Sequence, residues 1–161
     1  MDKYRFLEQE EGVKLLAFGR NIEELFENSA YALLEVMCSD KVRDTLVTNI
    51  KVVGEDYEEL LYHFLEELLL LFDSEKFILN KINRISKIRL NKDGKYELVA
   101  DISGDDAREY ELDLKVKEIV YEEIFVKSPD SNTNKKFNAL KTGSFSSHEK
   151  KKWVCQVVLG V

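Results

Sequence analysis

Acidic residues gather at two places where their side-chain oxygens could bind a cation. Glu8, Glu10 and Glu11 lie in one short acidic turn, and Glu122 and Glu123 follow in a later segment that alternates like a strand. Carboxylates that converge from neighbouring strands suit a hard cation such as Ca²⁺ or Mg²⁺, because these ions prefer oxygen ligands. A run of charges is also typical of a solvated turn that binds nothing. From the residues alone, both interpretations stay open.

The histidines and cysteines give little support to catalysis or to zinc binding. His63 lies inside a leucine-rich segment and His148 inside a lysine-rich one, and neither has a cysteine at metal-ligand spacing. Cys38 and Cys155 have apolar neighbours and form no CxxC pair, which predicts small core residues in a reducing compartment. The sequence also lacks the GxxxxGK[ST], GxGxxG, GxSxG and HExxH motifs. No phosphate-loop, dinucleotide, hydrolase or zinc-protease mechanism is therefore indicated.

Positive charge is concentrated in residues 127–152. This range holds the only proline and seven lysines against two acidic residues, so its net charge is +5. A segment of this length without hydrophobic periodicity predicts an insertion loop. The loop can be solvated and without a partner, or it can make a weak contact to RNA. In the second case its lysines would meet phosphates while Phe137, Phe145 and His148 stack on bases.

Length and composition predict one globular domain over residues 1–161, interrupted by that insertion. The 161 residues are 44% hydrophobic and 34% charged, with seven glycines. The net charge of -7 argues against a protein whose whole surface binds nucleic acid or anionic lipid. The amino terminus is charged and has no apolar signal region, and no uncharged run reaches the length of a membrane span. We expect a cytoplasmic protein with no membrane partner.

The elements that must position these residues follow from hydrophobic periodicity. Alternation predicts a hairpin from Tyr4 to Gly19 around the acidic turn, and a strand over 44–53. Between them, Asn21 and Glu24 have the spacing of a capping box, and apolar residues then recur at three and four positions. A helix over 21–38 is therefore predicted.

A second helix and several strands complete the expected fold. Asp56 and Glu59 repeat the capping signal ahead of a leucine-rich stripe that ends at Asp73. After it, strand-like segments cover 77–90, 96–102, 110–126 and 153–159, and no internal repeat is evident. Two helices and about seven strands predict an α+β domain, with the helices packed on one face of a mainly antiparallel or mixed sheet.

The chain resembles the archease family from end to end. The most specific stretches are GEDYEELLYHFLEELLLLFD at 54–73 and WVCQVVL at 153–159, and FLEQEEGVKLLAFG at 6–19 and KVKEIVYEE at 115–123 also match. The resemblance implies an archease-like α+β fold. It also implies an accessory protein of the tRNA-splicing RNA ligase, which promotes guanylylation and multiple turnover in tRNA splicing or RNA repair and has no catalytic residue of its own.

The resemblance further implies a site for calcium or another divalent cation, built from an F-L-D-H-T-A-D-V turn and a V-V-L-D-I tail. In this chain Glu8 falls at the first aspartate, Gly12 at the second and Gly160 at the tail aspartate. Glycine has no side-chain oxygen, so we expect no intact family site here. The weak remaining candidates are the carboxylates of Glu8, Glu11 and Glu122 and the terminal carboxylate of Val161.

One charged position of the family pattern is retained. The family's K-A-V-T-Y-H stretch falls at Lys117 to Glu122, with the lysine kept and the histidine replaced. The resemblance makes Lys117 the charged contact to the ligase or to its guanylylated intermediate. A different hypothesis is a divergent binding module or chaperone-like adaptor, which keeps the archease fold but has lost the metal site and ligase activation.

Overall fold

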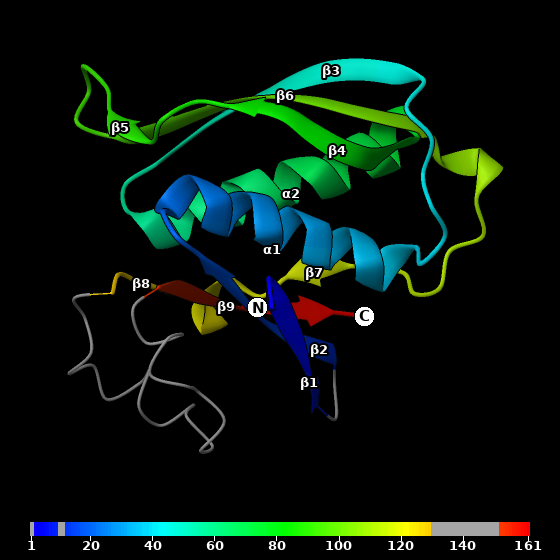
Figure 1. The fold of residues 1–161 in the computed structure, drawn as a ribbon, viewed down its shortest axis with the longest axis horizontal. Helices are drawn as coiled ribbons and strands as arrows, with labels where there is room; N and C mark the ends of the chain where they lie inside the picture. The colour runs from blue at the N-terminus through cyan, green and yellow to red at the C-terminus, as the bar shows by residue number, and fades with distance from the viewer. Residues whose placement is uncertain (1, 10–11, 130–151) are drawn as a thin grey trace.

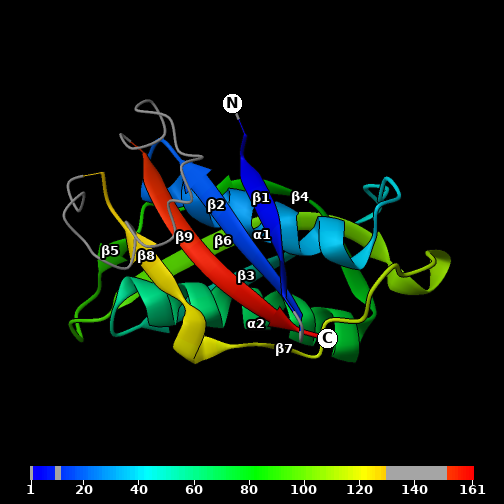
Figure 2. The same cartoon turned by 90° about the horizontal axis from the view of Figure 1, so that it is seen from below.

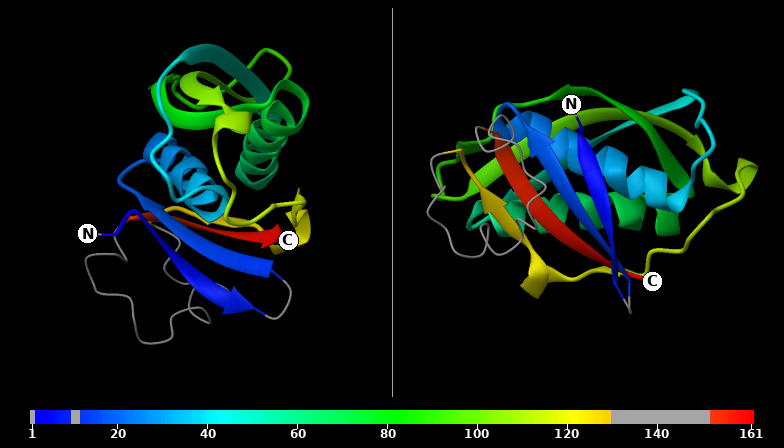
Figure 3. Two further views of the ribbon diagram at one scale, coloured as in Figure 1. Left: turned by 90° about the vertical axis from the view of Figure 1, so that its right-hand side faces the viewer. Right: turned by 60° about the horizontal axis from the view of Figure 1, so that its bottom comes forward.

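The residues that the structure describes form two antiparallel sheets with two helices between them, as Figure 1 and the left panel of Figure 3 show. The computed structural model describes residues 2–9, 12–129 and 152–161. Sheet A contains β1 (Tyr4–Gln9), β2 (Gly12–Gly19), β9 (Trp153–Gly160), β7 (Glu118–Ile119) and β8 (Phe125–Lys127). Sheet B contains β3 (Leu46–Gly54), β6 (Tyr96–Asp106), β4 (Phe77–Ile85) and β5 (Arg89–Leu90).

The middle layer consists of α1 (Ile22–Met37) and α2 (Tyr57–Glu75). The two helices meet at the aromatic rings of Phe26 and Phe64, whose centroids are 5.9 Å apart. Both rings are fully buried, so the centre of the core lies between the helices. Among the described residues, no helix has the length and apolar content needed to cross a membrane.

Strand β9 occupies the centre of sheet A. It pairs with β2 on one side and with β7 and β8 on the other, all antiparallel (Figure 2). Its register places Leu15 opposite Val157 and Ala17 opposite Cys155. These residues face the helices, while Leu16 and Phe18 form a smaller buried cluster on the other face of the sheet. Both faces of β2 and β9 therefore carry buried apolar residues.

The α+β class is confirmed, but the strands form two sheets rather than the single sheet that we expected. The reason lies in the width of the apolar stripe of α2. Residues on two sides of this helix are buried, namely Leu60, Leu61, Phe64, Leu65, Leu68 and Leu69. A helix that is apolar over so much of its circumference has to be covered from two directions. Here sheet A covers one side and sheet B the other (Figure 1).

The prediction of one long strand over 110–126 is wrong. After the short 3₁₀ helix η1 (Ala107–Glu109) the chain has no regular structure until β7, and a second 3₁₀ helix, η2 (Tyr121–Glu123), separates β7 from β8. The Val120 N–H donates to the Val158 carbonyl, so β7 and β8 pair with successive parts of β9 around this turn. Glu122 and Glu123 consequently lie on a turn and not on a strand.

Both helices begin with the same hydrogen-bonded cap, as their spacing predicts. The Asn21 side chain accepts from the Glu24 N–H at 2.8 Å, and the Asp56 side chain accepts from the Glu59 N–H at 2.8 Å. In return, each glutamate accepts a backbone N–H from the residue just before its cap. These reciprocal bonds satisfy amide groups that a helix start otherwise leaves without partners.

The caps are part of a repeated strand-to-helix turn that sequence inspection did not reveal. Gly19 ends β2 two residues before the first cap, and Gly54 ends β3 two residues before the second. A Cβ at Gly19 would lie 2.5 Å from the Leu25 nitrogen, and one at Gly54 would lie 2.5 Å from the Leu60 nitrogen. At both positions the helix backbone approaches the strand too closely for a side chain, which is the physical reason for glycine.

The predicted insertion at 127–152 falls almost entirely outside the described residues. Its described ends are Lys127, which closes β8, and Lys152, which precedes β9.

Candidate functional site

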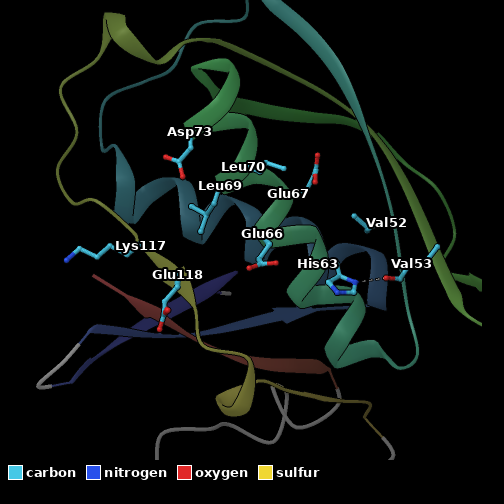
Figure 4. A pocket seen from close by; sticks show the side chains of 10 residues that line it. All are labelled: Val52, Val53, His63, Glu66, Glu67, Leu69, Leu70, Asp73, Lys117 and Glu118. Atoms are coloured by element: carbon cyan, nitrogen blue, oxygen red, sulfur yellow. Dashed lines mark hydrogen bonds between the residues drawn. The ribbon is translucent and has the colours of Figure 1, made fainter.

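A pocket of about 470 Å³ lies between α2, β3 and the segment that enters β7. We call it the Lys117 pocket, because it contains the one family-pattern lysine singled out from the sequence (Figure 4). Carboxylates dominate the charged groups around that lysine. The lining residues are Val52, Val53, His63, Glu66, Glu67, Leu69, Leu70, Asp73, Lys117 and Glu118.

Helix α2 supplies most of the residues that line the pocket. They lie on a side of the helix that neither sheet covers fully. His63, Glu66, Glu67 and Leu70 follow at helical spacing, so they project from neighbouring turns of one face. Leu70 is 54% exposed although it is apolar, which places an uncovered hydrophobic group among carboxylates. An exposed leucine in a charged pocket suits contact with a partner surface.

His63 is fixed against β3 by a backbone contact. Its Nδ1 lies 2.7 Å from the Val53 carbonyl oxygen, as the dashed line in Figure 4 marks. A carbonyl can only accept, so we assign the ring proton to Nδ1. In the neutral ring, Nε2 is then a hydrogen-bond acceptor at the wall of the Lys117 pocket.

Lys117 is held through its backbone, which leaves its side chain available. Its N–H donates to the Gly160 carbonyl at 2.8 Å, and the next residue, Glu118, pairs with Gly160 at the start of β7. Within the described ranges, no carboxylate forms an ion pair with the Lys117 ammonium. In Figure 4 the Lys117 and Glu118 side chains leave the same short segment in different directions.

The two glycine positions of the family's metal pattern lie next to each other and next to Lys117. Val13 pairs with Leu159, so the start of β2 lies beside the end of β9. A Cβ at Gly12 would lie 3.9 Å from the Cα of Gly160. The structure therefore brings three sequence-selected positions to one corner of sheet A, namely Lys117, Gly12 and Gly160.

This corner does not fit the divalent-cation site that the family resemblance implies. Gly12 has a φ of +128°, and a Cβ there would collide with the Leu159 carbonyl oxygen. A Cβ at Gly160 would lie 2.7 Å from the Cγ of Glu118. Across residues 2–9, 12–129 and 152–161, no group of three or more His, Cys, Asp or Glu residues is arranged to hold a metal. We therefore derive no function through a metal.

The remaining sequence candidates come from different elements, and the positions of Glu8 and Val161 adjoin this corner. Glu8 is in β1, where its backbone pairs with Val13, and Glu11 falls outside the described residues. Glu122 is exposed in η2. Val161 follows β9 and is 42% exposed.

Beyond Glu66, two tyrosines and the glutamates beside them form a margin of the pocket. The Tyr62 hydroxyl donates to the Glu66 carboxylate at 2.8 Å, and its ring meets that of Tyr121 edge to face at 5.1 Å. The hydrogen bond to Glu66 raises the pKa of Tyr62, with further contributions from burial and from the charges of Glu118 and Glu122. Both the pocket and its margin thus present negative charge around one ammonium group, an arrangement suited to binding a charged partner.

Sequence reasoning identified Lys117 but missed most of the residues around it. The sequence patterns give no role to Glu118, and they place His63 only inside a leucine-rich segment. A usable signal was the spacing of His63, Glu66 and Glu67, which puts three polar groups on one face of a leucine-rich helix.

The prediction that both cysteines are core residues is confirmed. Cys38 is 2% exposed and Cys155 is fully buried. The Cys155 Sγ lies 3.2 Å from the Ser29 hydroxyl, and burial raises the pKa of its thiol to about 12. Because the thiolate is the nucleophilic form, Cys155 is unsuited to covalent catalysis.

Both the sequence and the fold of this chain are similar to those of known proteins. A sequence model described as the Archease protein family matches residues 4–161. Protein archease of Pyrobaculum neutrophilum is 41% identical over 103 residues, which cover 63% of this chain and 68% of that protein. Protein archease of Pyrococcus abyssi is 34% identical over 135 residues, which cover 81% of this chain and 92% of that protein.

The solution structure of Methanobacterium thermoautotrophicum protein 1598 has the same fold. It matches with a TM-score of 0.70 over 100% of both chains at 24% identity. This likeness supports the arrangement of two helices between two sheets.

Proposed function

Because the chain belongs to the archease family, we propose that it is an accessory protein of the tRNA-splicing RNA ligase. In this role it promotes guanylylation of the ligase and repeated turnover in tRNA splicing or RNA repair, without catalysing ligation itself. The observation that carries the proposal is the family match over residues 4–161. We place this action in the cytoplasm as part of the same proposal.

The Lys117 pocket is the proposed contact with the ligase. Lys117 has a backbone fixed by Gly160, and its ammonium group has no carboxylate partner among the described residues. An unpaired ammonium beside exposed Leu70 offers one charged and one apolar contact at the same place. Such a combination suits contact with a protein surface, and the carboxylates around Lys117 favour a basic partner group over a phosphate.

The test is an assay of a cognate ligase with and without this protein. We expect the wild-type protein to increase the guanylylated fraction of the ligase and the number of products formed per ligase molecule. Lys117→Ala should reduce that stimulation at least about tenfold, a loss equivalent to about 1.4 kcal/mol. Lys115→Ala is the matched control, because Lys115 is exposed two residues away and does not line the pocket.

Two results would contradict the proposal. Absence of stimulation by the wild-type protein at every Mg²⁺ and Ca²⁺ concentration removes the accessory role. Equal loss in the Lys117 and Lys115 variants removes the assignment of the contact to Lys117.

A second candidate function is a binding module or chaperone-like adaptor that no longer activates a ligase. Its support is the pair of glycines, Gly12 and Gly160, at the positions of the family's metal-holding aspartates. The guanylylation assay distinguishes the two functions, because the adaptor should not stimulate a ligase. Gly160→Asp tests the loss of the metal site by calorimetric titration with Ca²⁺, since only the flexible Glu118 side chain has to move to admit the aspartate.

A further inference from the structure

A second concentration of positive charge lies on sheet B, away from the insertion. Residues 81–95 contain a single acidic residue, Asp93, and have a net charge of +5 within a chain of net charge -7. The segment includes the end of β4, all of β5 and the turn that leads to β6. Its basic residues are Lys81, Arg84, Lys87, Arg89, Lys92 and Lys95.

Most of these cations have no carboxylate partner. Lys81 lies 3.9 Å from Asp44, and Lys95 lies 3.6 Å from Glu55. Within the described part of the chain, no ion pair joins Arg84, Lys87, Arg89 or Lys92 to an acidic side chain. All four of these residues are exposed.

Three of the unpaired cations, Arg84, Lys87 and Arg89, line one hollow of about 570 Å³, which we call the basic hollow. Glu97, the one carboxylate among its described lining residues, is already 3.7 Å from the ammonium group of Lys51. The hollow shares no lining residue with the Lys117 pocket. It is lined by Arg84, Ile85, Ser86, Lys87, Arg89, Leu90, Asn91, Glu97 and Val99.

The backbone explains why the hollow forms. β4 ends at Ile85 and β5 begins at Arg89, and both pair with β6 along the same edge of sheet B (Figure 1). In the gap, the Ser86 N–H donates to the Val99 carbonyl and the Ser86 hydroxyl accepts from the Val99 N–H. The chain is thus held against β6 while its basic side chains project from an interrupted edge.

Charged side chains on an edge strand also have a purely structural role, because they prevent pairing with another sheet. That role needs charge along the edge but no ligand. A purely structural role predicts no saturable binding of a ligand. A binding measurement therefore distinguishes this role from a ligand site.

We propose that the basic hollow binds the phosphodiester backbone of a single-stranded nucleic acid. Arginine presents paired N–H groups that match phosphate oxygens, and Arg84 and Arg89 supply two such groups beside Lys87. A nucleic acid strand repeats its negative charge at short intervals, so it can meet several cations along one edge. The described residues that line the hollow include no aromatic side chain, so we expect contacts to phosphate and little selectivity for base sequence.

The choice of RNA as the nucleic acid rests on the proposed function. In that setting the basic hollow would hold substrate RNA while the Lys117 pocket contacts the ligase. The two surfaces share no lining residue, so one can fail without the other.

The experiment is fluorescence anisotropy of a labelled 20-nucleotide single-stranded RNA of mixed sequence, titrated with the full chain at several salt concentrations. Lys87→Ala/Arg89→Ala should weaken binding about tenfold and reduce the slope of log K against log salt by about 1.4, since each single-strand phosphate contact contributes about 0.7. Lys41→Ala/Lys115→Ala removes the same charge at exposed positions outside the hollow. This control should leave the slope unchanged.

Each of three outcomes would overturn the proposal. In the first, the wild-type chain binds no RNA. In the second, both double variants lose affinity equally, and in the third, deletion of 130–148 abolishes binding while Lys87→Ala/Arg89→Ala retains it. Binding to phosphatidylserine vesicles with no binding to RNA likewise rejects a nucleic-acid surface. Ligase guanylylation measured with the same proteins separates this proposal from the proposed function, because full stimulation by a wild-type chain that binds no RNA contradicts only the basic hollow.

Discussion

The buried carboxylate of Asp105 holds two connecting segments of the chain in place. It lies near the end of β6, with its side chain 7% exposed. The Thr45 and Tyr110 hydroxyls donate to its two oxygens, and the Arg43 guanidinium lies 3.3 Å away. These partners come from the segments before β3 and after η1. Asp105 therefore ties both segments to sheet B.

Its titration predicts a dependence of stability on pH. The hydrogen bonds from Thr45 and Tyr110 lower the pKa of Asp105 from 3.8 to about 2. Since the folded pKa lies below the unfolded one, the stabilisation is complete above about pH 4 and is lost as the pH falls towards 2. Asp105→Asn should lower the melting temperature at pH 7, and the difference from wild type should shrink between pH 4 and pH 2. Asp93→Asn, in an exposed turn, is the control.

Gly12 and Gly94 allow a test of backbone strain at matched positions, because both have positive φ angles. Around Gly94 there is open space, whereas a Cβ at Gly12 would meet the Leu159 carbonyl. Gly94→Ala should cost about 1 kcal/mol from conformation alone, and Gly12→Ala should cost about 3 kcal/mol or more because the strand must also shift. Urea denaturation measures both. Equal losses would show that the contact with β9 is unimportant.

At the scale of elements, capping signals were the most reliable part of the sequence. Asn21 and Asp56 predicted the starts of both helices, because a cap acts through neighbours only three residues away. The strand predicted over 110–126 is wrong because the structure there depends on contacts with residues distant in sequence. Its alternation continues through η2, and the turn there depends on pairing with β9, which is distant in sequence.

The cap of α2 yields a prediction of its own. Asp56→Ala should destabilise the protein by about 1 kcal/mol, because the Glu59 N–H loses its acceptor. Asp56→Asn should restore most of that stability, since asparagine caps about as well. Urea denaturation of the three proteins checks this, and a loss in Asp56→Asn equal to that in Asp56→Ala would assign the effect to charge instead of the cap.

At the scale of the molecule, the number of layers was the main feature that the sequence left undetermined. Alternation shows that a strand has a buried face, but it does not say which sheet the strand joins. The candidate site was only partly predictable for a related reason. Lys117 came from a local motif, whereas its neighbours on α2 are brought to it by the packing of α2 beside β7.

The central position of the helices predicts that the two sheets unfold together. Phe64 is fully buried and contacts Phe26 across the helix interface. Phe64→Ala should cost about 3 to 5 kcal/mol, and Phe64→Leu should cost less. Hydrogen exchange followed residue by residue should show equal losses of protection in β6 and β9. Separate transitions for sheets A and B would contradict a single domain over 1–161.

The position of β9 also bears on the order in which the protein assembles. All strands of sheet B lie between Leu46 and Asp106, so their pairing joins nearby parts of the chain. Sheet A instead joins β2, near the amino terminus, to β9 at Trp153–Gly160. Closing so long a loop has a larger entropic cost and slows pairing. We therefore expect sheet B and α2 to fold first, and the corner that holds Gly12, Gly160 and Lys117 to be completed last.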